Sequence, residues 1–185
     1  MTDLKKTKRI YIVLSQTGTI MSRLIKLYTR EEYNHVSISL SPDLRLFYSF
    51  GRRTPYNPFN SGFVEESPEF GLFRRFPNTK VAVLSIALDE EKYDAIASLI
   101  ASMAENKEKY GYNHLGFWGA AVNLPMKSRD RYFCSEFIKY IFERFEIEGA
   151  EELGRLPHPI HFLNLSRAER VYTGTLSAYR ELAQK

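Results

Sequence analysis

Apolar and polar residues alternate over the first half of the chain in a pattern typical of β-strands. Residues 10–15 form a short, β-branched, apolar run, which predicts a buried strand. Residues 33–40 alternate strictly, so their apolar side chains point to one face of a strand while His35 and two serines point to the other. The turn signal Ser41-Pro42-Asp43 separates this strand from another one, predicted over residues 44–50.

The second half of the chain mixes strand-like and helical periodicity. Residues 80–88 predict a strand, and Asp89 is expected to cap a helix over residues 90–105. Phenylalanine and isoleucine recur every three or four residues over 134–145, which predicts an amphipathic helix. Weaker patterns predict helices at 20–28, 115–124 and 178–183 and a strand at 169–172.

Residues 51–77 contain four of the eight prolines and three of the ten glycines, so we expect a long excursion with one short strand near 63–64. Strands and helices are mixed without strict alternation, which predicts an α+β fold with a small antiparallel sheet. A length of 185 residues fits one domain spanning residues 1–185.

The two strands on either side of Ser41-Pro42-Asp43 suggest a specific pairing. A three-residue loop would place Ile38 opposite Leu46 and His35 opposite Ser49. A slip of one residue would bury serines among apolar side chains, so the pattern resists it. Opposing residues in such a pair lie about 4.5–5.5 Å apart at Cβ, so this register would bring a hydroxyl close to the imidazole.

Cys134 is the only cysteine, and it stands at the start of the helix predicted over 134–145. Unpaired backbone N–H groups and the helix dipole favour a thiolate at such a position. Because the thiolate is the nucleophile, this is where a catalytic cysteine would be placed. The alternative is a small buried apolar residue, as free cysteines often are.

Charge and cysteine content limit the classes of function. The chain has 26 basic and 22 acidic residues, interspersed, for a net charge of +4 and no basic stripe typical of nucleic-acid binding. A single cysteine cannot form an internal disulfide, which fits a reducing compartment. The apolar run behind the basic N-terminus, residues 10–14, is too short for a signal peptide or a membrane span. We therefore expect a cytoplasmic protein without an integral membrane segment.

Two motifs resemble those of a known family. Asn34-His35-Val36-Ser37-Ile38 is similar to the family's His-Val-Gly-Ile strand, and Phe133-Cys134-Ser135-Glu136-Phe137-Ile138 is similar to its Cys-Ser-Glu helix start. With histidine before cysteine, the chain resembles the circularly permuted papain-like hydrolases of NlpC type, the YiiX/YaeF-like group, which are related to the lecithin:retinol acyltransferase fold. The resemblance covers roughly residues 10–162.

The resemblance implies a papain-like fold with Cys134 as nucleophile and His35 as base. The position that matches the family's third polar group is Ser49, and Glu65 or Glu66 could reach in from the 51–77 excursion instead. No metal or organic cofactor is implied. A metal site formed by His158, His161 and Cys134 is disfavoured, because prolines flank His158 and no second cysteine or clustered carboxylate completes the ligand set.

Four further residues are candidates for the oxyanion hole or the cleft. The backbone N–H of Cys134 is the natural oxyanion donor, and Gln16 is a side-chain candidate. Arg52 could bind a substrate carboxylate or phosphate with both arms of its guanidinium. Tyr112 and His158, the latter in a proline-containing loop that resembles the family's, are placed at the cleft.

The leading hypothesis is a thiol hydrolase or acyltransferase that forms an acyl-enzyme on Cys134. The resemblance implies a small-molecule, peptide-amide or lipid acyl substrate. Two alternatives stay open: a non-catalytic binding module, which the unusual Ser49 favours, and a redox-sensing thiol protein. The sequence does not determine the substrate, the acyl acceptor or the oligomeric state.

Overall fold

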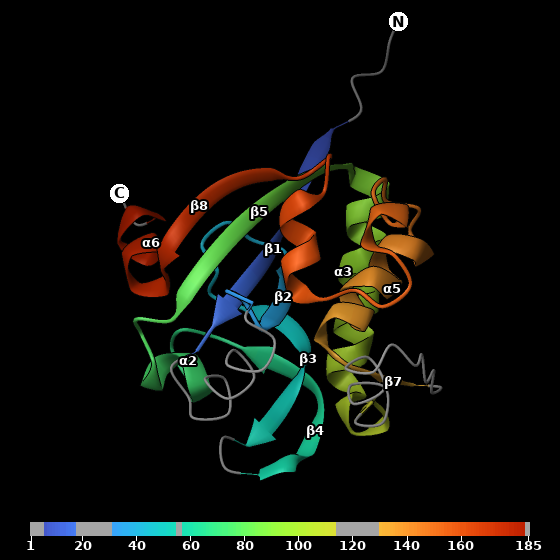
Figure 1. Cartoon of the computed structure of the whole chain (residues 1–185). Helices are drawn as coiled ribbons and strands as arrows, with labels where there is room; N and C mark the ends of the chain where they lie inside the picture. Colours follow the sequence, from blue (N-terminus) through green and yellow to red (C-terminus); the bar gives the residue numbers. More distant parts are fainter. Residues whose placement is uncertain (1–5, 18–30, 55–56, 114–129, 184–185) are drawn as a thin grey trace, which may run out of the picture.

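A computed structural model describes residues 6–17, 31–54, 57–113 and 130–183, which form an α+β fold (Figure 1). Within these residues one eight-stranded sheet has the order β7-β6-β4-β3-β2-β1-β5-β8. The strands are β1 (Thr7–Gln16), β2 (His35–Ser39), β3 (Phe47–Thr54), β4 (Asn57–Glu66), β5 (Lys80–Asp89), β6 (Gly111–Tyr112), β7 (Arg131–Tyr132) and β8 (Glu169–Thr175). The helices are α2 (Gly71–Arg75), α3 (Glu90–Glu105), α5 (Cys134–Arg144) and α6 (Leu176–Ala183), with the 3-10 turns η1 (Lys107–Lys109), η2 (Glu151–Leu153) and η3 (Pro159–Asn164).

The α+β class predicted from the sequence is confirmed, but the sheet is larger and less uniform than expected. All neighbouring strands are antiparallel except β6 and β7, which are parallel. The strands predicted at 10–15, 33–40 and 80–88 are present, as is the cap of α3, where the Asp89 carboxylate accepts the Lys92 backbone N–H at 2.8 Å. The helices predicted at 20–28 and 115–124 lie outside the described residues.

The sheet has an apolar core on each face. On one face it packs against α3 and α5, through residues such as Ile96, Ile100 and Phe137. On the other face a smaller core includes Phe73 from α2 and Leu176 from α6. Figure 1 shows α3 and α5 beside one another, with α6 at the far end of β8. Because strand residues alternate between the faces, β1, β3 and β5 each supply residues to both cores.

The predicted register of the β2–β3 hairpin is wrong by two residues. Ile38 pairs with Tyr48 and not with Leu46. The connection is longer than three residues because Leu44 adopts a left-handed backbone (φ 49°) and is buried in the smaller core. Since side chains alternate with a period of two, the shift leaves every side chain on its predicted face. It places His35 opposite Gly51, where a Cβ would lie 3.6 Å from the imidazole Cε1.

The expected excursion over 51–77 is in large part a regular hairpin. Strand β3 continues to Thr54, and β4 extends over ten residues, where the sequence suggested one short strand. The glycines suggested a loop, but Gly62 lies within the sheet, where a side chain would not fit. A Cβ on Gly62 would lie 2.3 Å from the Tyr110 carbonyl oxygen. Gly62 therefore permits β6 to approach β4, and the hairpin carries Glu66 back towards β2.

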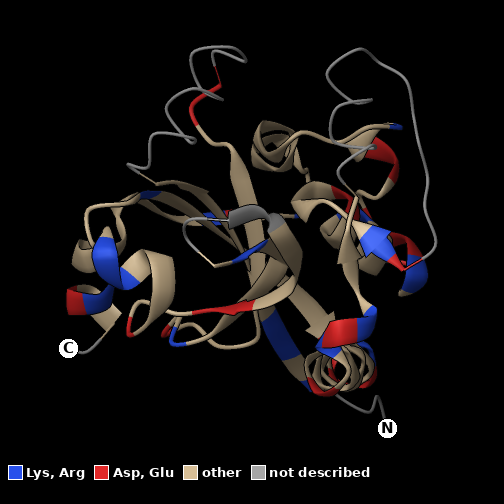
Figure 2. Ribbon diagram, turned by 90° about the horizontal axis from the view of Figure 1, so that it is seen from below, with Lys and Arg blue, Asp and Glu red and all other residues tan. Residues whose placement is uncertain are grey.

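Two general properties of the molecule are the distribution of its charged residues and the length and polarity of its helices. In the view of Figure 2, Lys and Arg positions are interspersed with Asp and Glu positions along the ribbon. This distribution agrees with the mixed pattern of charges along the sequence. No helix among the described residues is long and apolar enough to cross a membrane.

Candidate active site

Cys134 is the first residue of α5, as the sequence predicted. The start of the helix is held by Glu136, whose carboxylate accepts the Phe133 backbone N–H at 3.1 Å and the Asn113 side-chain amide at 3.2 Å. The cysteine is 6% exposed. Its thiol therefore stands at a tethered helix N-terminus, where unpaired N–H groups favour negative charge.

His35, the first residue of β2, lies between Cys134 and Glu66. Its Nε2 is 3.0 Å from Glu66 Oε1 and 3.1 Å from Glu66 Oε2. The Cys134 side chain forms a hydrogen bond with the imidazole. Because Nε2 is directed at the carboxylate, Nδ1 is the nitrogen available to the thiol. Glu66 is the last residue of β4, so three elements of the fold meet in this chain of groups.

Two buried serines fix the Glu66 carboxylate. Ser37 Oγ donates to Glu66 Oε2 at 2.6 Å, and Ser49 Oγ donates to the same oxygen at 2.9 Å. Ser49 Oγ also lies 3.2 Å from His35 Nε2. Both serines are buried, while the His35 and Glu66 side chains keep 19% and 14% of their surface exposed. The carboxylate is thus oriented on its buried side and paired with the imidazole.

The electrostatics of the pair favour the doubly charged form. Burial lowers the pKa of His35, but the negative charge of Glu66 and hydrogen bonds with Cys134 and Glu66 outweigh it, so this pKa is raised well above 6.5. Burial raises the pKa of Glu66, but the charge of His35 and hydrogen bonds from His35, Ser37 and Ser49 outweigh it, so this pKa is lowered below 4.5. An imidazolium–carboxylate pair at neutral pH follows from these two shifts.

Ser49 therefore occupies a different position from the one predicted for it. It is not the residue directly opposite His35, because the hairpin register is shifted. Glu66 contacts the imidazole more closely, and Ser49 contacts both members of the pair. Glu65 is exposed, whereas Glu66 is turned towards His35, which resolves the alternative left open by the sequence.

Ser15 lies directly opposite His35 in the β1–β2 pair. Its side chain is fully buried, and its hydroxyl has no hydrogen-bond partner in the described part of the chain. Such a hydroxyl costs the folded state about 1–3 kcal/mol. We expect Ser15→Ala to raise the free energy of unfolding by about 1 kcal/mol in urea denaturation at pH 7.

The matched control for this prediction is Ser37→Ala, which should lower the free energy of unfolding because Ser37 donates to the Glu66 carboxylate. A loss of stability in Ser15→Ala comparable with that in Ser37→Ala would contradict the prediction. It would show that the Ser15 hydroxyl is satisfied in the folded protein.

Two of the predicted cleft residues lie close to Cys134. Tyr112 is in β6, and its pKa is raised well above 10 by burial first and then by the charges of Cys134 and Glu136. The positive charge of Arg52 on β3 acts in the opposite direction on the same phenol. The structure therefore brings Tyr112 and Arg52 to the N-terminal end of α5.

The loop that carries His158 is attached to the same end of α5. Ser135 Oγ donates to the Pro157 carbonyl at 2.6 Å, in a buried contact. His158 itself pairs with Glu31, with Nδ1 2.9 Å from Oε1, and its ring centroid is 5.4 Å from that of His161. His158 thus lies beside the site, and its contacts in the structure are with Glu31 and His161.

Gln16 is placed at the correct end of the sheet for the oxyanion role expected of it. It follows Ser15, which pairs with His35, and it pairs with Lys80 on β5. Its contribution to an oxyanion hole remains a prediction.

Among the described residues, no group of three His, Cys, Asp or Glu side chains is arranged to hold a metal ion.

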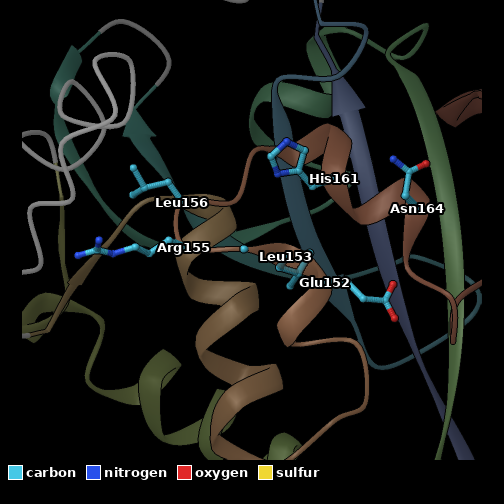
Figure 3. Close-up of a pocket in the computed structure, with 7 residues that line it drawn as sticks. Glu152, Leu153, Arg155, Leu156, His161 and Asn164 are labelled. Atoms are coloured by element: carbon cyan, nitrogen blue, oxygen red, sulfur yellow. The ribbon is translucent and has the colours of Figure 1, made fainter.

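A cavity of about 470 Å³ lies beside the loop that carries His158 (Figure 3). It is lined by Glu152, Leu153, Gly154, Arg155, Leu156, His161 and Asn164. None of these is a predicted site residue. Figure 3 shows Arg155 and Leu156 directed to one side and Glu152 and Asn164 to the other, so the polar groups do not converge on one point.

No match to the chain was found among protein-family models, curated proteins or solved structures.

Proposed function

We propose that the protein is a cysteine-dependent hydrolase or acyltransferase that forms an acyl-enzyme on Cys134. The observation that carries this proposal is the position of His35, hydrogen-bonded to the thiol on one side and to the Glu66 carboxylate on the other. A nucleophile, a base and a group that orients the base are the three parts that nucleophilic acyl transfer requires.

The chemical steps follow from these positions. His35 holds the thiol proton, and the Cys134 thiolate attacks the carbonyl carbon of an amide, ester or thioester, forming a C–S bond. The backbone N–H of Cys134 stabilises the resulting oxyanion, with Gln16 and Tyr112 as side-chain candidates. The imidazolium then protonates the leaving amine, alcohol or thiol as its bond to carbon breaks.

The acyl-enzyme is resolved by water or by another acceptor. His35 removes a proton from the acceptor, which attacks the thioester carbonyl, and the Cys134 thiolate leaves. Glu66 stabilises the imidazolium in both halves of the reaction, since its carboxylate is paired with Nε2 and does not need to accept the proton itself.

We propose further that the fold is a permuted papain-like one. The support is the order of the functional groups: a strand histidine, then a carboxylate on a nearby strand, then a cysteine that begins a helix packed against the sheet. The motifs around His35 and Cys134 supply the second line of support. The substrate classes that this resemblance suggests are peptide amides and lipid acyl esters.

The case for a non-catalytic binding module becomes weaker with Glu66 in place. That alternative rested on Ser49 as an unorthodox third group, because a hydroxyl stabilises imidazolium less than a carboxylate does. Glu66 supplies the carboxylate, and Ser49 supports it.

The test is the rate of alkylation of Cys134 by iodoacetamide against pH, read by intact mass. We expect the wild-type protein to react well below pH 7, and His35→Ala to react only as an ordinary thiol with a pKa of about 8.5 does. His161→Ala is the matched control, since the His161 ring contacts His158 in the structure; its profile should follow the wild type.

A wild-type profile typical of a free thiol, or no labelling in the folded state, would reject the catalytic proposal. Trapping of an acyl adduct on Cys134 separates the hydrolase from the redox sensor. A sensor would accumulate sulfenic acid under peroxide and no acyl adduct from activated esters.

A further inference from the structure

Three strands align polar side chains in one row. Arg52 on β3 pairs with Ser61 on β4. Gly62, the next residue, pairs with Gly111 on β6, and these strands are antiparallel, so Ser61 faces Tyr112. The side chains of Arg52, Ser61 and Tyr112 therefore share one face of the sheet, in adjacent strands about 4.8 Å apart.

This row lies on the side of the sheet that α5 covers. Phe50 precedes Arg52 by two residues and pairs with Phe63, so both phenylalanines share its face. The Phe137 ring of α5 packs on both, with centroid distances of 5.2 and 5.8 Å. Cys134 is one helical turn before Phe137 and belongs to the same apolar core as Phe50 and Phe63.

The charges around the row agree with this placement. The charges of Cys134 and Arg52 both act on the Tyr112 phenol, so it lies near both groups. All three members of the row are partly exposed and can be reached from solvent.

We propose that Arg52, with the hydroxyls of Ser61 and Tyr112, forms a subsite that binds a carboxylate of the acyl donor. The inference rests on the proposed function and specifies its substrate class: donors that carry a negative charge near the reacting carbonyl. A guanidinium fork suits a carboxylate because it donates two parallel hydrogen bonds, and hydroxyl groups complete the set of donors.

The experiment compares thiol reagents that differ mainly in charge. Two pairs are used, iodoacetate with iodoacetamide and 3-maleimidopropionate with N-ethylmaleimide, so that two distances between carboxylate and sulfur are sampled. The readout is the ratio of anionic to neutral labelling rates at Cys134. In Arg52→Gln we expect this ratio to fall about 10-fold for at least one pair, the size of one well-placed charge-assisted contact. Arg52→Lys should restore part of it.

The matched control is Arg131→Gln, which removes the same charge from an exposed position next to Gly111 in the neighbouring row. It should change the ratio by less than about 2-fold, as expected for a screened surface charge. Circular dichroism melts verify that each variant is folded.

The outcomes separate this inference from the one on which it rests. Labelling of Cys134 with a ratio that does not depend on Arg52 would overturn the subsite and leave the acyl-transfer proposal intact. An equal fall of the anionic-to-neutral ratio in Arg131→Gln would also overturn the subsite. The positive charge of the surface in general would then explain the preference for anionic reagents. Failure of every reagent to label the folded protein would reject both proposals.

Discussion

Glu66→Gln is expected to slow alkylation of Cys134 at pH 6 by about 100-fold, within the range found for removal of an acid–base group. The substitution keeps the size of the side chain and a hydrogen-bond acceptor for His35, but it removes the charge that holds the imidazole protonated. Without the imidazolium, the thiolate loses the cation that neutralises it. The measurement is the iodoacetamide rate read by intact mass.

The chain offers an adjacent control for this substitution. Glu65→Gln makes the same chemical change one residue earlier in β4, where the side chain is exposed and pairs across the strand with Tyr48. Its labelling rate should stay within about 2-fold of wild type, since exposed charges are screened. Equal rates for Glu66→Gln and wild type would show that the carboxylate does not assist the thiol.

The two central residues of the site could be nominated from the sequence because their signals are local. Cys134 stands where the amphipathic pattern of a helix begins. His35 stands on the polar face of a strand whose apolar and polar residues strictly alternate. Both features depend on neighbouring residues alone. The structure places both residues as this reasoning requires, at the first position of α5 and of β2.

Glu66 could not be chosen in the same way, because its role depends on a pairing between distant strands. It comes 31 residues after His35, within a stretch whose prolines and glycines gave no strand period. The long β3–β4 hairpin brings it back, with Glu66 opposite Phe47. A sequence pattern shows which face a strand residue takes, but not where a neighbouring strand ends.

The register of β2 and β3 illustrates the same limit. The apolar pattern excluded a slip of one residue, and the observed shift of two residues satisfies that pattern equally well. The backbone conformation of Leu44 and its burial in the smaller core determine the loop length. Those are tertiary contacts, which a hairpin considered alone does not contain.

The coupling between His35 and Glu66 should depend on pH in a defined window. The pKa of Glu66 is lowered from 4.5, so its contribution to stability is present above pH 4.5 and is lost as pH falls through the folded-state pKa. The pKa of His35 is raised from 6.5, so its contribution is complete below pH 6.5 and is lost as pH rises through the folded-state pKa. Both contributions are complete only between these two values.

A double-mutant cycle with His35→Gln and Glu66→Gln measures this coupling by urea denaturation. We expect a coupling free energy of about 2–4 kcal/mol near pH 5.5, because a largely buried charge left without its partner costs that much. The coupling should decrease towards pH 3 and again at alkaline pH.

The pKa of His161 is shifted in the opposite direction from that of His35. Its pKa is lowered, first by burial and then by the charge of His158, so protonation at acid pH opposes folding. His161→Gln should therefore gain stability relative to wild type as pH falls below 6.5, while the His35–Glu66 coupling is still near its maximum. A coupling that is constant from pH 3 to 9 would mean that the pair is held together by neutral hydrogen bonds. The imidazolium, and with it the ion pair required for the proposed chemistry, would then be absent from the folded protein.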